Sequence, residues 1–312
     1  MKARVRAWAV AFGLILAAIQ PIHTTQAADK MQPFVLASVV PGGDMAATVA
    51  AVKDKLTAAG FQVAGTYAPY PAATILVVTS DALKAAAAKS EFGGYGVAQR
   101  VSVTQVGGDL QVSYTNPPYM AAAYRMGDDL QGTADALAQA LGKQQEYGAE
   151  KEAMTADDLR GYHYMFGMEY FDEPSTLNTF ASHAEAVETV EKNLAAGLGG
   201  VTKVFRIDVP GKEESLFGVA MDGNKGEGTM QDDAYIMGKI DFKPMRSTAH
   251  LPYEILVSGN TAYALYARFR IAINFPDLSM MGDNSFFSIM ESPATIERAL
   301  TRIAGGKVKK AQ

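Results

Sequence analysis

The sequence predicts an α+β protein with two related domains, each an antiparallel sheet with helices packed on one face. A motif that occurs twice in the same order indicates an internal duplication. In the first half it reads Asn116-Pro117-Pro118 followed by Met126-Gly127-Asp128-Asp129. In the second half it reads Asn274-Phe275-Pro276 followed by Met281-Gly282-Asp283-Asn284. Predicted strands and helices also mix without a regular βαβ rhythm, which favours antiparallel sheets.

A similar hairpin precedes each copy of the motif. It reads Val106-Gly107-Gly108-Asp109-Leu110 in the first half and Val257-Ser258-Gly259-Asn260-Thr261 in the second. Glycine or asparagine between alternating apolar runs is typical of tight turns that join antiparallel strands. The hairpins therefore support both the duplication and the antiparallel pairing.

Apolar spacing and turn residues place the elements of the first half. Asp44 caps a helix in which Val49, Val52 and Leu56 share one face, and Gly60 ends that helix. The predicted strands cover 34–40, 61–70, 73–79, 97–105 and 110–114, and the predicted helices cover 44–60, 81–90 and 127–141.

The second half repeats much of this order after a charged segment. Residues 143–160 are rich in Glu, Lys, Gln and Asp, and Thr155 with Asp158 resembles a capping box. Beyond it the predicted strands cover 163–171, 201–209, 216–221, 234–242, 255–258 and 262–273, and the predicted helices cover 184–196 and 294–304. The expected domains are a first α+β domain over 28–147, a charged linker over 148–160 and a second, diverged α+β domain over 161–312.

The first residues have the layout of a secretory signal peptide. Lys2, Arg4 and Arg6 precede an apolar run over 7–19, and Thr25-Gln26-Ala27 offers small residues to a signal peptidase. We expect cleavage after Ala27, a periplasmic or secreted protein, and no transmembrane segment afterwards. The leader carries three basic residues and no acid, so the formal charge of −5 becomes −8 in the mature chain. Nucleic acid is not an expected partner, because clustered positive charge is missing.

Residues that are absent exclude several kinds of chemistry. The chain has no cysteine, which removes thiol nucleophiles, redox pairs, iron–sulfur clusters and covalent haem attachment. Motifs of serine hydrolases, zinc peptidases and nucleotide-binding loops are missing as well. The first hypothesis is therefore an exported, non-catalytic protein that binds a small molecule or a partner protein. A copper or haem binding protein that uses Met and His is the alternative, and an unrecognised hydrolase is the second alternative.

The repeated motif supplies the candidate ligand-binding residues. Asn116 and Asn274 offer donors and acceptors, Asp128 and Asp283 follow a glycine where a helix is expected to begin, and Tyr119 flanks a proline turn. A tyrosine beside a cleft suits a flat ligand. The competing interpretation is structural, because Asn before Pro forms turns and Asp after Gly forms N-caps.

Methionine and histidine supply the candidate metal ligands. Ten of the 15 methionines follow Gly148, and His163 and Met165 lie in a cluster of Tyr, Met and Phe. Together with His250 they are candidates for Cu(I) or an axial haem position, which suit soft thioether and imidazole ligands. Methionine is also a common core filler, so packing is the competing interpretation.

The first half resembles the bacterial family called domain of unknown function 302. The resemblance covers about residues 45–142 and rests on a helix that ends Ala58-Ala59-Gly60-Phe61, then a strand, a second helix and a hairpin, and Asn116-Pro117-Pro118 before the last helix. The second half, with Asn274-Phe275-Pro276, would be a diverged copy that carries an insertion. The resemblance implies a small α+β fold and no assigned catalytic activity.

Overall fold

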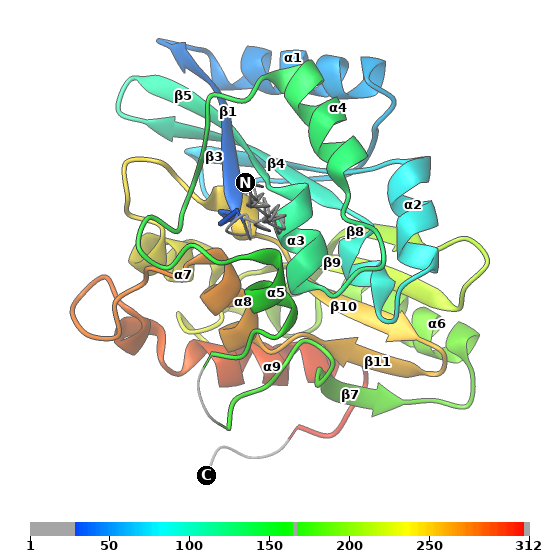
Figure 1. The fold of residues 1–312 in the computed structure, drawn as a ribbon. Coiled ribbons are helices and arrows are strands. Elements are labelled where there is room, and N and C mark those ends of the chain that lie inside the picture. The colour runs from blue at the N-terminus through cyan, green and yellow to red at the C-terminus, as the bar shows by residue number, and fades with distance from the viewer. Residues whose placement is uncertain (1–28, 165–166, 309–312) are drawn as a thin grey trace, which may run out of the picture.

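Two antiparallel sheets, one from each half of the chain, organise the fold (Figure 1). The computed structural model describes residues 29–164 and 167–308. The first sheet has the strand order β2-β3-β4-β5-β1-β6 and the second has the order β7-β11-β10-β9-β8. Every strand pair is antiparallel, and helices pack on both sheets. The predicted α+β class is confirmed.

The elements of the two halves follow one another in the same order. The first half comprises β1 (Phe34–Pro41), α1 (Met45–Ala58), β2 (Gln62–Tyr67), β3 (Ala73–Thr79), α2 (Asp81–Ala88), β4 (Gln99–Val106), β5 (Asp109–Thr115), α3 (Pro117–Ala123), α4 (Gln131–Leu141) and β6 (Gln145–Tyr147). Between the halves lies α5 (Ala156–Arg160). The second half comprises β7 (Ser175–Thr179), α6 (His183–Ala195), β8 (Val201–Asp208), β9 (Glu214–Met221), α7 (Asp233–Ile240), β10 (Tyr253–Ser258), β11 (Thr261–Ala264), α8 (Ala267–Asn274) and α9 (Ser292–Ile303).

The strand orders match as well. If β7 is set against β1 and the later elements are paired in sequence, β8-β9-β10-β11-β7 reproduces β2-β3-β4-β5-β1. Both predicted hairpins are present at equivalent places, as β4–β5 and as β10–β11. This connectivity is what a duplication would produce, and the duplication itself stays a prediction.

The repeated Asn-x-Pro sequences do not stand at equivalent places. Asn116 is the N-cap of α3, whereas Asn274 is the last residue of α8, the helix that matches α3. The Met-Gly-Asp sequences both lie between the last two helices of their halves, but neither begins a helix. The cap of α4 is Leu130, and α9 starts nine residues after Asp283.

Three predicted strands of the second half are wrong. Residues 234–240 belong to α7, because Asp232 caps that helix and Ile236, Met237 and Ile240 share its buried face. The strand predicted over 262–273 stops at Ala264, and α8 follows it. The described part of 163–171 is irregular, and the first strand of the second sheet is β7 instead.

Part of the charged segment 143–160, which we call the charged joint, belongs structurally to the first half. Strand β6 pairs with β1 and extends the first sheet, and α5 carries the predicted capping box between Thr155 and Asp158. The domain boundaries themselves stay predictions. None of the helices in the described residues is long and apolar enough to cross a membrane, and the predicted signal peptide lies outside those residues.

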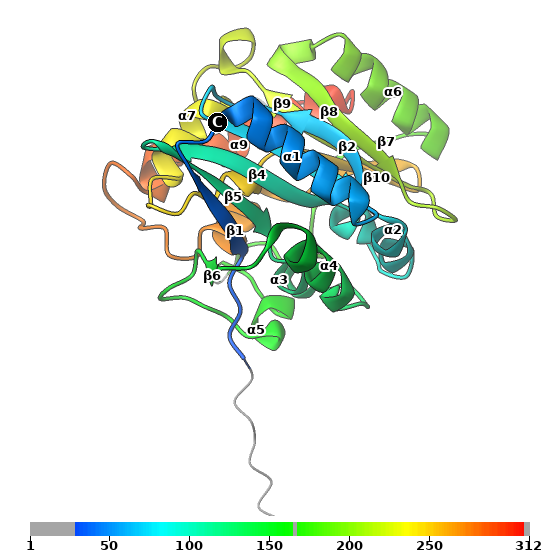
Figure 2. The same cartoon turned by 90° about the horizontal axis from the view of Figure 1, so that it is seen from above.

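The two halves pack closely on each other. Strands β2 and β8 lie side by side (Figure 2), and a Cβ at Gly65 would come within 2.6 Å of the carbonyl oxygen of Val204. Glycine is therefore required there by close backbone approach. The segment 93–96 packs on β9 and β10, and the equivalent segment 248–250 packs on β3, β4 and β5. One continuous apolar core results, with residues from both halves.

Candidate functional site

A cavity of about 220 Å³ opens between α8, α9 and two loop segments of the second half. Residues 275–290 form one loop wall, and Tyr162, Tyr164 and Met168 form the other. Four of the lining side chains are aromatic and two are methionines: Tyr162, Tyr164, Phe275, Phe286, Met168 and Met290. Cavities of this kind, mostly apolar with few polar groups, are where small molecules usually bind.

Helix α8 provides the floor of the pocket. Ile271, Ala272 and Phe275 follow one another at helical spacing and all line the pocket. Their exposed fractions are 2%, 7% and 9%, so little solvent reaches this depth. A residue as small as Ala272 leaves space at the centre of the floor, which a larger apolar side chain would fill.

The polar group of the pocket is an ion pair. The Arg268 guanidinium donates from Nε to Glu169 Oε2 at 2.6 Å and from Nη2 to Glu169 Oε1. Arg268 also lies over the ring of Tyr266, 5.3 Å from its centroid. Side-chain exposure is 35% for Arg268 and 16% for Glu169, so the pair is half-buried. Because the two charges neutralise each other, the pocket presents no net charge from this pair.

Exposed apolar side chains gather in the loop between α8 and α9, which forms one wall of the pocket. Met280, Met281, Phe287 and Met290 are 45%, 70%, 56% and 56% exposed, and the Tyr164 hydroxyl contacts the sulfur of Met280. Apolar side chains gathered at one place on a surface usually mark a binding region. We call these four residues the rim.

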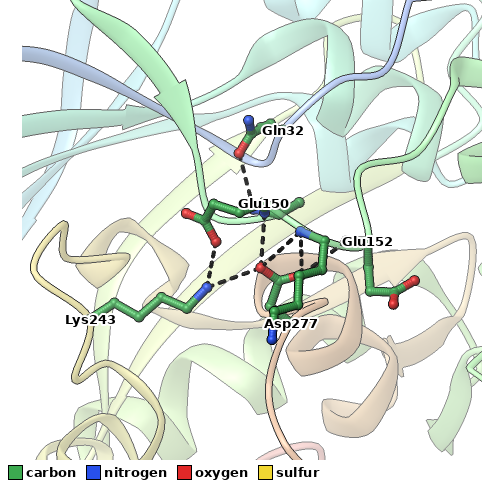
Figure 3. A network of polar contacts seen from close by, with 7 residues as sticks. Gln32, Glu150, Glu152, Lys243 and Asp277 are labelled. Atoms are coloured by element: carbon green, nitrogen blue, oxygen red, sulfur yellow. Dashed lines mark hydrogen bonds and ion pairs between the residues drawn. The ribbon is translucent and has the colours of Figure 1, made fainter.

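A network of hydrogen bonds holds one wall of the pocket in place (Figure 3). The Asp277 carboxylate accepts from the backbone N–H groups of Glu150, Lys151 and Glu152, and Lys243 contacts both Asp277 and Glu150. Burial opposes the charge of Asp277, but these hydrogen bonds and Lys243 outweigh it and lower the pKa of Asp277 to about 2. The network fastens the loop that carries Pro276 and Leu278 to the charged joint.

Replacing Asp277 with alanine is expected to destabilise the protein by about 2 kcal/mol, because three backbone donors lose a charged acceptor. Hydrogen exchange at residues 150–152 should become faster. Chemical unfolding and exchange mass spectrometry measure the two effects. Asp54→Ala, on the exposed face of α1, is the matched control and should change neither. Unchanged exchange at 150–152 in Asp277→Ala would show that the network does not hold the joint.

The second notable feature is a buried polar centre between the two halves. Arg100 on β4 contacts Glu254 on β10, and Arg270 on α8 lies 3.8 Å from the same carboxylate. All three are at most 2% exposed. Phe275 connects this centre to the pocket, since its ring packs against His250 with centroids 5.2 Å apart. The three charged side chains of the centre do not line the pocket.

The five predicted ligand-binding residues do not line the pocket as the structure describes it. Asn116 is buried and donates to Gln32 O and Glu146 Oε2. Tyr119 is fully buried and donates to the carbonyl of Ile273 at 2.7 Å. The other three act locally. Asn274 is buried and donates to the carbonyl of Arg270, Asp128 is exposed and accepts from the N–H of Leu130, and Asp283 lies exposed in the loop before α9.

The candidate metal ligands are also dispersed. Met165 lies outside the described residues, and the His163 ring packs against Tyr170. His250 is fully buried with Nε2 3.2 Å from the Tyr253 hydroxyl. Burial and the nearby Arg270 and Arg100 hold the pKa of His250 well below its usual range. Two guanidinium groups near a neutral imidazole disfavour a cation there, and within 29–164 and 167–308 no three His, Cys, Asp or Glu side chains form a possible metal site.

Sequence reasoning missed the residues that build the pocket. Arg268 and Ala272 fall within the strand predicted over 262–273, and Glu169 is not among the candidate site residues. The enrichment of methionine in the second half does indicate where the pocket lies. Met168 and Met290 line the pocket, and Met280 and Met281 belong to the rim.

Comparison with known protein families, with functionally described proteins and with solved structures finds no match to this chain. The resemblance of the first half to domain of unknown function 302 stays a prediction. The chemistry of the pocket is therefore the basis for assigning a function.

Proposed function

We propose that this protein is an exported, non-catalytic binding protein that holds a small, mainly apolar molecule in the pocket between α8 and α9. The observation that carries the proposal is the cavity of about 220 Å³ with its aromatic, aliphatic and thioether lining. Pockets lined mainly by apolar and aromatic side chains with a few polar groups are the usual binding sites of small molecules. The exposed apolar side chains of the rim belong to the loop that forms one wall of the pocket, which adds apolar surface near it.

The chemistry of the lining supports binding rather than catalysis. The side chains that line the described pocket include no Ser, Thr, His or Asp. Burial, together with the nearby Tyr164 and Glu152, raises the pKa of Tyr162 to about 12, which makes it a poor proton donor or acceptor near neutral pH. Arg268 and Glu169 are bound to each other. The pocket therefore offers shape and apolar surface but no activated group.

Filling the pocket floor is expected to weaken binding at least about tenfold, because a few methylene groups placed in an apolar site exclude a ligand of that size. Ala272→Leu makes this change from a position that is 7% exposed. Binding can be measured with N-phenylnaphthylamine, whose fluorescence rises in an apolar site. The only tryptophan, Trp8, lies in the predicted signal peptide, so the mature chain adds no tryptophan background.

Ala46→Leu, on the exposed face of α1, is the matched control and should bind the dye like the wild type. Thermal unfolding of both variants separates a filled pocket from a misfolded chain. Absence of dye binding to the wild type, or equal binding to folded Ala272→Leu, would contradict the proposal.

A partner protein is a second candidate because the rim is exposed and apolar. A partner would cover Met281 and Phe287, whereas a small molecule would occupy the interior next to Ala272. Met281→Ser combined with Phe287→Ser changes the rim without changing the pocket lining at Ala272. Loss of a co-purifying protein in this variant, with dye binding retained, would favour the partner protein.

A further inference from the structure

We propose that the ligand is a neutral aromatic molecule of one or two fused rings that carries a hydroxyl or carbonyl group directed at Arg268. The inference rests on the proposed function and specifies the chemical class of the ligand. Three properties of the pocket support it: its size, the chemical character of its walls and the state of its ion pair.

The size of the cavity suits a compact bicyclic molecule. An engineered apolar cavity of about 150 Å³ in another protein binds benzene. The cavity here, at about 220 Å³, is roughly half as large again and has space for a second ring. A saturated chain of ten carbons has a comparable volume, so the size alone does not distinguish the two classes.

The side chains that line the pocket favour an aromatic ligand over a flexible saturated chain. Tyr164 and Phe286 line the pocket as a tilted aromatic pair, with centroids 6.4 Å apart and an interplanar angle of 32°. Tyr162 is held edge-on against Phe269 at 6.1 Å. The thioethers of Met168 and Met290 complete the lining, and sulfur interacts favourably with ring edges. Rings gain from stacked and edge-on contacts that a saturated chain cannot make, and they lose less conformational freedom on binding.

The ion pair selects for a neutral ligand with a hydrogen-bond acceptor. Arg268 uses Nε and Nη2 to bind Glu169, and its Nη1 has no hydrogen-bond partner in the part of the chain that the structure describes. A guanidinium offers five N–H groups, so Nη1 remains available as a donor on a residue that lines the pocket. An anionic ligand would have to compete with Glu169 for the guanidinium. A hydroxyl or carbonyl oxygen accepts from Nη1 without disturbing the pair.

Displacement of N-phenylnaphthylamine by four matched competitors tests the ligand class. These are β-naphthol, naphthalene, decanol and β-naphthoate. The first three separate the ring from the hydroxyl, and the last replaces the hydroxyl with a carboxylate. We expect β-naphthol to bind roughly tenfold more tightly than naphthalene, the equivalent of one net hydrogen bond to a charged group. Decanol and β-naphthoate should both be weaker than β-naphthol.

Decanol that binds as tightly as β-naphthol would overturn the aromatic class, and tighter binding of β-naphthoate would overturn the neutral class. In both cases the dye would still bind and Ala272→Leu would still block it, so the proposed function would survive. Failure of the dye to bind the wild type would remove the proposed function and the inference together.

A paired substitution tests the role of Arg268. Arg268→Met with Glu169→Met removes both charges, so neither is left unpaired, and it should lower the affinity for β-naphthol to that for naphthalene. Asp81→Met with Lys84→Met removes a surface ion pair on α2 and is the control. Retention of the preference for β-naphthol in the folded pocket variant would show that Arg268 does not bind the hydroxyl.

Discussion

Replacing Glu254 with glutamine is expected to destabilise the protein by about 3–5 kcal/mol, the usual cost of leaving a buried charge without its partner. Glu254 lies between Arg100 and Arg270, and all three side chains are at most 2% exposed. Without its charge, two guanidinium groups would remain in the interior with no carboxylate between them. Urea unfolding measures the loss. Glu188→Gln, on the exposed face of α6, is the control and should stay within about 0.5 kcal/mol of the wild type.

The loss of stability is expected to be large because Arg100, Glu254 and Arg270 lie between the two halves. Arg100 belongs to β4 of the first sheet and Glu254 to β10, the equivalent strand of the second, so the ion pair joins the two halves. Arg270 adds hydrogen bonds to the carbonyls of Pro252 and His250. Arg100→Met should also be strongly destabilising, and its combination with Glu254→Gln should cost less than the sum of the two, because the second change neutralises the charge that the first leaves behind. Additive losses would show that the two side chains do not interact.

The fold class could be predicted because its signals are local. Asp44 caps α1 as expected, with its carboxylate accepting from the N–H of Ala47 at 2.8 Å, and both hairpins lie where glycines follow alternating runs. The errors in the second half come from tertiary contacts. Arg268 and Arg270 alternate with apolar residues as on a half-exposed strand, yet Arg270 is 1% exposed inside a helix. In the sequence pattern, Arg270 cannot be distinguished from an exposed residue, because its contact with the buried Glu254 exists only in the folded protein.

The candidate site could not be predicted from motifs, because no contiguous segment forms it. Its walls come from an irregular segment near Tyr162, from α8, from the loop after Phe275 and from the start of α9. The conspicuous Asn116 and Asn274 instead satisfy nearby backbone and side-chain groups. Turn residues with strong local preferences stand out in a sequence, whereas pocket residues are ordinary apolar side chains that only the topology brings together.

The stability of the protein is expected to fall as the pH rises from 5 to 7.5, by about 2 kcal/mol in the free energy of unfolding. Burial raises the pKa of Asp233 to about 7 and that of Asp241 to about 6. Between their unfolded and folded pKa values the native state holds protons that the unfolded chain has released, so stability is lost as the pH rises through the folded values. These two groups together account for roughly 4 kcal/mol over this range.

His250 offsets part of that change. Its pKa is held well below 6.5 in the native state, so the unfolded chain binds the extra proton in acid and stability is gained as the pH rises toward 6.5. The unfolded pKa of 6.5 limits this gain to at most about 2 kcal/mol between pH 5 and 7.5, so the net fall is at least the value given above. Asp277, with its lowered pKa of about 2, stabilises the folded protein equally throughout this range. Its contribution to the free energy of unfolding is lost only as the pH falls below about 4.

Asp233→Asn should remove most of the pH dependence. An asparagine oxygen can still accept from the Tyr67 hydroxyl and from the N–H of Met221, now 2.6 and 2.9 Å from the carboxylate, but it carries no proton to release. Only Asp241 and His250 would then titrate, and because their contributions have opposite signs, the stability of the variant should differ little between pH 5 and pH 7.5. Urea unfolding at several pH values tests this, with Asp54→Asn as the exposed control. A wild type equally stable at both pH values, or a variant that keeps the wild-type slope, would contradict the assignment.

The same two carboxylates stand at the two ends of α7, where that helix meets the first half. Asp233 accepts from Tyr67 on β2, and Asp241 binds Thr248, whose hydroxyl contacts Thr104 on β4 at 2.9 Å. Ionising them places buried negative charge at the junction between the halves, which weakens the contacts that join α7 to the first sheet. Protection against hydrogen exchange, taken relative to the intrinsic exchange rate at each pH, should therefore fall first in α7 when the pH is raised from 5 to 7.5, and Asp233→Asn should suppress that fall.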